Sequence, residues 1–145
     1  ADGRTLVFTS CDGRQNFGRC DLYVTYRIGD DWTEPINLGN KINSAAWESQ
    51  PSLSADGRTL FFASDRRGTY GKRDIWMSRL ESDGSWGAAA NLGPTINTAS
   101  DEYRPVLARD LVNFTYTLML FSSNRPGGKG GFDLYMVGLP GDKAR

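Results

Sequence analysis

The stretch of sequence that decides the fold is Ala55-Asp56-Gly57-Arg58-Thr59-Leu60, which repeats Ala1-Asp2-Gly3-Arg4-Thr5-Leu6 letter for letter 54 positions later. The same offset relates further residues: Phe8 and Phe62, Trp32 and Trp86, Asn37-Leu38-Gly39 and Asn91-Leu92-Gly93, Glu48 and Glu102. A third copy follows the second after 59 positions, with Phe121, Ser123, Arg125 and Asp133 in place of Phe62, Ser64, Arg66 and Asp74. Repetition of this kind is typical of proteins built from equivalent units. We therefore expect one domain made of three units, at about residues 1–50, 51–104 and 105–145.

Each unit reads as strands joined by turns. In the second unit, Asp56 and Gly57 supply the side-chain acceptor and the positive φ that a tight turn needs. The flanking runs predict four short antiparallel strands: Pro51–Ser54, Thr59–Ser64, Asp74–Arg79 and one that begins near Trp86. The third strand opens on an acidic, an aliphatic and an aromatic residue in every copy: Asp21-Leu22-Tyr23, Asp74-Ile75-Trp76 and Asp133-Leu134-Tyr135. Because no stretch shows the 3.6-residue apolar period of a helix, the expected fold class is all-β.

The composition narrows the class of protein. The chain has 145 residues, with 17 Lys+Arg balanced by 17 Asp+Glu, and no His. A neutral charge balance lacks the basic footprint of a nucleic-acid binder, and no apolar run is long enough for a membrane-spanning helix. The lack of His removes the Ser-His-Asp arrangement and most catalytic zinc sites.

The second unit carries three motifs in the order Pro51-Ser52-Leu53-Ser54-Ala55-Asp56-Gly57, Phe62-Ala63-Ser64-Asp65-Arg66-Arg67-Gly68 and Asp74-Ile75-Trp76. On these motifs the chain resembles the WD-type β-propeller repeats of the TolB-like family, and the resemblance covers nearly the entire chain. It implies β-propeller blades of four antiparallel strands that pack against neighbouring blades. Similar repeats occur in periplasmic translocation proteins, in propellers attached to OmpA-like peptidoglycan-binding domains and in other exported bacterial proteins. The resemblance therefore implies a periplasmic or extracellular protein, with outer-membrane association as a variant.

Two of the three expected blades are incomplete. The first begins at its turn, without a Pro-x-x-Ser strand before Ala1, and the third ends soon after Tyr135 without a Trp-containing fourth strand. Because propellers have roughly four to eight blades, we expect an open, partial propeller that is completed by missing sequence or by another copy of the chain. Missing sequence is the preferred interpretation, because unpaired strand edges favour pairing with further strands.

The third unit departs from the pattern between Pro105 and Phe121, which enclose five more residues than Pro51 and Phe62 do. The Asp-Gly turn is replaced by Ala108-Arg109-Asp110-Leu111, and residues 112–118 alternate apolar and polar side chains. This predicts a longer strand or hairpin that projects from one end of the blade. It is interpreted either as a tolerated insertion or as an element that contacts a partner, for which Tyr116 is a candidate binding residue.

Cys11 and Cys20 flank the loop between the second and third strands of the first unit, and their counterparts in the second unit are Asp65 and Arg73. Positions that hold opposite charges in one unit and two cysteines in another are expected to face each other. We predict a disulfide, which would stabilise the chain by about 2–3 kcal/mol, against about 0–1 kcal/mol for an exposed ion pair. Free thiols and half of a metal site are the alternatives, although the spacing suits zinc poorly. A disulfide implies an oxidising compartment.

Carboxylates recur at one position per unit, namely Asp21, Asp74 and Asp133. Catalysis needs an asymmetric constellation around one substrate, so residues repeated in every unit are expected to serve the fold. They would cap turn amides or pair with the repeated Arg66 and Arg125. We therefore expect no enzyme activity, catalytic residue, metal site or cofactor. Calcium is the alternative, since oxygen ligands of the kind it prefers occur at Asp12, Asn16, Asp65, Asn124 and Asp133.

Aromatic residues are the candidates for a binding surface. Trp47 lies on the connection into the second unit, and its counterpart in the next unit is Asp101. A Trp at such a place stacks on a sugar or a partner protein, or is buried against the adjoining blade. Phe17 and Tyr70, in equivalent loops of successive units, leave the same interpretations open.

The sequence as a whole predicts a non-catalytic binding or scaffold module of an exported bacterial β-propeller, which contacts a protein or a cell-wall glycan partner. One alternative is a portion of a glycan-processing or other hydrolytic propeller, which would need non-repeated carboxylates that converge on one mouth of the ring. The other is a calcium-stabilised, sugar-binding lectin, which would need repeated exposed aromatic residues beside polar groups.

Overall fold

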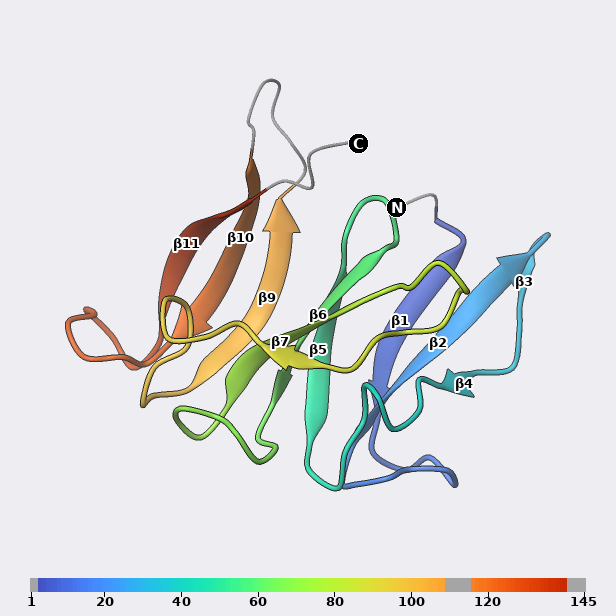
Figure 1. Ribbon diagram of the computed structural model, residues 1–145, viewed down its shortest axis with the longest axis horizontal. Helices are drawn as coiled ribbons and strands as arrows, with labels where there is room; N and C mark the ends of the chain where they lie inside the picture. The colour runs from blue at the N-terminus through green and yellow to red at the C-terminus, as the bar shows by residue number, and fades with distance from the viewer. Residues whose placement is uncertain (1–2, 109–115, 141–145) are drawn as a thin grey trace.

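The chain folds into three antiparallel β-sheets that lie side by side (Figure 1). This computed structural model describes residues 3–108 and 116–140. Sheet 1 contains β1 (Thr5–Ser10), β2 (Asp21–Ile28), β3 (Asp31–Trp32) and β4 (Ile36–Asn37). Sheet 2 contains β5 (Glu48–Leu53), β6 (Thr59–Ser64), β7 (Asp74–Arg79) and β8 (Ala90–Asn91), and sheet 3 contains β9 (Glu102–Ala108), β10 (Tyr116–Ser123) and β11 (Asp133–Pro140).

The all-β class predicted from the sequence is confirmed, because the described residues are strands, turns and loops without a helix. Accordingly, nothing in this part of the chain is a helix of the length and hydropathy that crossing a membrane requires. Sheet 2 has the predicted four strands in the order β5-β6-β7-β8. The described residues form three neighbouring sheets and do not close a ring.

The central hairpin is the element that the three sheets share. Ser10 pairs with Asp21 in sheet 1, Ser64 with Asp74 in sheet 2, and Ser123 with Asp133 in sheet 3. The predicted strands Thr59–Ser64 and Asp74–Arg79 are confirmed. In sheet 3, β10 and β11 have 8 residues each, against 6 each in β6 and β7. The insertion predicted at residues 112–118 falls mostly on 109–115, outside the described part of the chain.

The first strand of sheet 2 differs from its predicted extent. β5 begins at Glu48 and not at Pro51, because Glu48 and Ser49 pair with β6 before the register shifts at a bulge. Gln50 occupies the bulge with a positive φ of 54°, and Arg104 in β9 repeats it with a φ of 51°. Pro51 has no N–H to donate to a ladder hydrogen bond. It lies beside the bulge inside β5, and not at the start of the strand as predicted.

The fourth strand of sheet 2 is also shorter than predicted. β8 contains only Ala90 and Asn91, and Trp86 makes one isolated bridge to Leu80. Between them, the Gly87 amide donates to the Arg79 carbonyl of β7 over 2.8 Å, and regular strand pairing resumes only at Ala90.

The apolar core lies between the sheets. Leu22 and Ile42 pack against Leu60, Phe62 and Trp76 at the interface of sheets 1 and 2. The interface of sheets 2 and 3 is built from Phe61, Ile75, Ile96, Met119 and Phe121. Successive β6 residues thus face opposite interfaces, because side chains alternate across a strand. Sheet 2 is buried on both sides.

Candidate functional site

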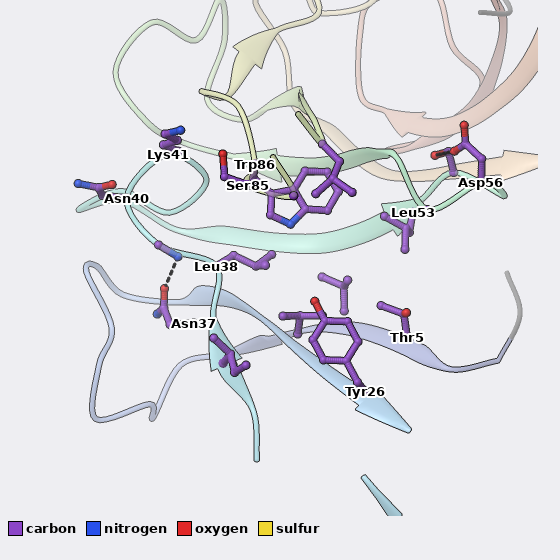
Figure 2. A pocket seen from close by; sticks show the side chains of 18 of the residues that line it. Thr5, Tyr26, Asn37, Leu38, Asn40, Lys41, Leu53, Asp56, Ser85 and Trp86 are labelled. Carbon is purple, nitrogen blue, oxygen red and sulfur yellow. Dashed lines mark hydrogen bonds between the residues drawn. The ribbon is translucent and has the colours of Figure 1, made fainter. Parts of the chain in front are cut away.

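An open cleft lies between sheets 1 and 2, beside the packed core of their interface. Its volume is about 860 Å³, which is within the usual range of about 300–1,000 Å³ for ligand pockets. Val7, Val24 and Tyr26 line it from sheet 1, and Leu53 and Trp86 line it from sheet 2. Figure 2 shows Tyr26 and Trp86 on opposite walls, with Leu38 between the two sheets. The walls are therefore mainly apolar and include two aromatic rings.

The repeat explains why this interface is open. Val7 and Val24 occupy the positions that Phe61 and Met77 hold in sheet 2. Phe61 and Met77 pack into the interface with sheet 3, whereas valine leaves unfilled the space of about four heavy atoms in place of phenylalanine and of about one in place of methionine. Tyr26, which stands where sheet 2 has Arg79, remains 45% exposed in the cleft. Smaller side chains at two repeated positions thus contribute to the opening of this interface.

The mouth of the cleft is polar. Asn40 and Lys41 lie at one end, and Asp56 lies at the other (Figure 2). The Ser54 hydroxyl donates to Asp56 Oδ1 over 2.5 Å and the Arg58 amide donates to the same oxygen over 3.0 Å. These bonds stabilise the carboxylate, and they lower the pKa of Asp56 from its ordinary 3.8. The cleft therefore offers an apolar interior between a cationic and an anionic end.

The repeated aspartates hold the loops between the second and third strands. Asp21 accepts the amide N–H groups of Phe17 and Gly18, and Asp74 accepts those of Tyr70 and Gly71. Asp133 does the same for Lys129 and Gly130. Each carboxylate therefore caps loop amides in its own unit, which is one of the two roles proposed from the sequence.

The repeated arginines take different partners from those proposed. Arg66 Nη2 lies 3.1 Å from Glu48 Oε1 and also donates to the Ile42 carbonyl. Its guanidinium lies 5.0 Å from the Trp76 ring centroid. Burial lowers the pKa of Arg66 below its ordinary value, and the charge of Glu48 opposes this shift.

Arg125 repeats the arrangement in the next unit. It lies 3.2 Å from Glu102 Oε1, and it donates to the Ile96 carbonyl over 2.6 Å. The glutamates, and not the repeated aspartates, thus neutralise both arginines, because the aspartate carboxylates are already occupied by loop amides.

The predicted disulfide between Cys11 and Cys20 is confirmed. It closes the β1–β2 loop and indicates an oxidising compartment. The counterparts Asp65 and Arg73 have other partners: Asp65 binds Arg19 over 2.6 Å and accepts the Trp47 amide over 2.9 Å. Asp65 and Arg73 therefore bind groups of neighbouring segments, whereas the two cysteines of the first unit are bonded to each other.

Three of the four candidate binding residues lie on loops at one end of the sheets. Phe17 and Tyr70 are half-exposed, at 51% and 52%. Trp47 is half-buried, and the Arg73 guanidinium stacks on it at 4.1 Å from the ring centroid. Tyr116 begins β10 at the opposite end of its hairpin, opposite Pro140, and its side chain lies outside the described part. Within the part of the chain that the structure describes, Phe17, Tyr70 and Trp47 do not converge on one site with the start of β10.

The part of the chain that the structure describes contains no cluster of side chains suited to binding a metal ion. Within residues 3–108 and 116–140, no three side chains of His, Cys, Asp or Glu lie close enough together to hold an ion. The calcium candidates Asp65 and Asp133 are engaged by Arg19, the Trp47 amide and loop amides.

Sequence reasoning missed the residues of the cleft. The signal was present in the repeat, where Val7 and Val24 align with the larger Phe61 and Met77. A comparison of side-chain volume at equivalent positions, and not of residue class, would have located the opening.

Compared with known proteins, the chain matches no family model, and no curated protein matches it.

Proposed function

We propose that the chain is a non-catalytic binding module of an exported bacterial protein, with TolB-like β-propeller repeats, and that it binds an apolar segment of a protein partner in the cleft between sheets 1 and 2. The disulfide supports a periplasmic or extracellular location. The repeated carboxylates support a non-catalytic role, because Asp21, Asp74, Glu48 and Glu102 are buried and bonded to groups of the fold itself.

The single observation that carries the proposal is the open cleft at an interface whose repeated counterpart holds larger side chains. Exposed aromatic and aliphatic walls are typical of sites where a partner inserts an anchor residue. Lys41 and Asp56 at the two ends place opposite charges beside the apolar interior, which suits a peptide segment with polar flanks. A sugar would need more polar groups inside the cleft than these walls provide.

The test is selection of peptides from a random display library on the oxidised chain, followed by measurement of their Kd. The matched control is the double variant Val7→Phe, Val24→Met, which introduces side chains similar to those of sheet 2. We expect selected peptides that carry an apolar anchor, and an affinity at least about tenfold weaker for the filled variant. Thermal unfolding of the variant verifies that it folds.

Peptides that bind the wild-type chain and the folded double variant equally would contradict the cleft as the binding site. Purified peptidoglycan sacculi are tested in parallel by sedimentation. The proposal would be overturned if no peptide is selected and if the wild-type chain and the filled variant bind sacculi equally. That result would favour a cell-wall partner at another surface.

A further inference from the structure

In the part of the chain that the structure describes, the outer edge of sheet 3 lacks a set of contacts that both other sheets possess. In sheets 1 and 2, a segment that begins at the final residue of the last strand runs along the third strand: Asn37-Leu38-Gly39-Asn40-Lys41-Ile42-Asn43 and Asn91-Leu92-Gly93-Pro94-Thr95-Ile96-Asn97. Both segments have the form Asn-Leu-Gly-x-x-Ile-Asn. We call this the exit segment. None of the described residues lies in the equivalent place beside β11, the outermost strand at the left of Figure 1.

The first asparagine of the exit segment binds the repeated aspartate. Asn37 Nδ2 donates to Asp21 over 2.8 Å, and Asn91 Nδ2 donates to Asp74 over 2.6 Å. Asp133 accepts the amides of Lys129 and Gly130, both at Oδ2, whereas Asp21 and Asp74 each accept one loop amide on each oxygen. Within the described part of the chain, it has no asparagine beside it. Among the described residues, no side chain therefore occupies the acceptor position of Asp133 that Asn37 and Asn91 occupy on Asp21 and Asp74.

The second asparagine binds the backbone of the next residue on the third strand. Asn43 accepts the Leu22 N–H over 2.8 Å and donates to the Leu22 carbonyl over 3.0 Å. Asn97 makes the same two bonds to Ile75, at 2.8 and 2.9 Å. The equivalent residue of β11 is Leu134. It is 76% exposed, whereas Leu22 and Ile75 are fully buried.

A glycine three residues before each aspartate makes room for the chain that follows the exit segment. A Cβ on Gly18 would lie 2.3 Å from the Ala46 carbonyl oxygen, and a Cβ on Gly71 would lie 2.0 Å from that of Ser100. The same position in sheet 3 is Gly130, whose Cβ would meet only the Phe132 carbonyl oxygen, at 3.8 Å. The space beside Gly130 is therefore not occupied by any described residue of this chain.

The apolar face of the edge is also uncovered. Met136 is 66% exposed, and it occupies the position of Met77, which packs into the interface between sheets 2 and 3. Leu134 and Met136 thus have the residue types of buried positions but lie in solvent. An isoleucine from an exit segment, like Ile42 and Ile96, would cover part of this surface.

We propose that the edge of β11 is a docking site for an extended polypeptide segment of the form Asn-Leu-Gly-x-x-Ile-Asn. The first asparagine donates to Asp133, the second binds the N–H and C=O of Leu134, and the residues after it pass against Gly130. The isoleucine covers Leu134 and Met136. This site is independent of the cleft between sheets 1 and 2.

The experiment uses the full oxidised chain and a synthetic peptide with the sequence of Ala90–Asp101 as the probe. Binding is followed by anisotropy of the labelled peptide and by amide chemical shifts. We expect shifts at Lys129, Gly130 and Leu134. A peptide with Asn91→Ala and Asn97→Ala is expected to bind at least about tenfold more weakly, because it leaves polar groups of the edge unpaired.

The protein variant Gly130→Ala separates docking from folding. The added Cβ meets nothing closer than 3.8 Å within the described chain, so the variant is expected to unfold at the wild-type temperature. It should nevertheless lose the peptide, because a Cβ at the equivalent Gly71 would overlap the segment that docks there.

Three outcomes would overturn the proposal. The first two are no binding of the wild-type peptide to the folded chain, and equal binding of this peptide to the wild-type chain and to Gly130→Ala. The third is a set of chemical shift changes confined to Asp74 and Ile75, which would mean that the peptide replaces the chain's own segment. If the chain self-associates, the proposal requires the dimer to dissociate on addition of peptide and to be absent in Gly130→Ala. A dimer that persists in both conditions would also contradict it.

Discussion

The interfaces on the two sides of sheet 2 share their polar contacts and differ in their apolar ones. Glu48, Arg66 and the Ile42 carbonyl on one side correspond to Glu102, Arg125 and the Ile96 carbonyl on the other. The apolar positions, in contrast, hold Val7 and Val24 on the open side, and Phe61 and Met77 on the packed side.

This difference shows which parts of a repeat are free to change. Buried charges need a fixed geometry and fixed partners, so the polar contacts recur with nearly the same distances. Apolar packing depends on volume and tolerates a smaller side chain at the cost of some stability. A binding cleft can therefore arise between two sheets without any change in the contacts that hold them together.

The largest expected effect comes from removing the shared polar contact. Glu48→Ala leaves the buried Arg66 without its counter-charge, and Glu102→Ala does the same to Arg125. Each should lower the free energy of unfolding by about 3 kcal/mol, as measured by urea denaturation. Glu34→Ala, at an exposed position, is the control and should change it by less than about 0.5 kcal/mol. A large difference between the two glutamate variants would show that the polar contacts are not equivalent.

A second change makes the packed interface resemble the open one. The double variant Phe61→Val, Met77→Val truncates side chains at the interface of sheets 2 and 3, and it should cost about 2–4 kcal/mol in urea denaturation. The opposite exchange, Val7→Phe with Val24→Met, should raise the free energy of unfolding by about 1 kcal/mol. Changes of the same sign in both variants would show that side-chain volume does not distinguish the interfaces.

The smallest effect concerns Asp56 at the mouth of the cleft. Hydrogen bonds lower its pKa in the folded chain below 3.8, so the ionised carboxylate stabilises the fold above that pH. Asp56→Asn should cost about 0.5 kcal/mol at pH 7, since the group is largely exposed and screened by solvent. The benefit declines as pH falls from 3.8 through the lowered pKa, and the two proteins should converge only below that lowered pKa. A difference that persists in thermal unfolding at lower pH would mean that the carboxylate charge is not responsible.

Local patterns were sufficient to predict the hairpins. The β6 and β7 strands have the predicted bounds because an Asp-Gly turn and apolar runs define them within a short stretch. The start of β5 was not predicted, because a bulge at Gln50 allows pairing to extend before Pro51. Bulges depend on the partner strand, which the local sequence does not contain.

The disulfide was predictable because one unit could be compared with the next, but most of the site was not. The partners of Arg66 are Glu48 on β5 and the Ile42 carbonyl on the exit segment, and such contacts depend on how separate segments pack. The cleft depends on a difference in volume at Val7 and Val24 that residue class conceals. Of the two roles predicted for the repeated aspartates, Asp74 has the capping of loop amides, and Arg66 pairs with Glu48 in its place.

The exit segment between sheets 1 and 2 also determines how the protein can be divided. Asn43 is bonded to Leu22 in sheet 1, whereas the Ile42 carbonyl and Ser44 are bonded to Arg66 and Glu48 of sheet 2. A cut before this segment would remove from sheet 1 the asparagine that binds Leu22, and a cut after Ser44 would remove from sheet 2 the Ile42 carbonyl and the Ser44 amide. The two sheets share these residues, so neither can be excised with all of its buried polar groups satisfied.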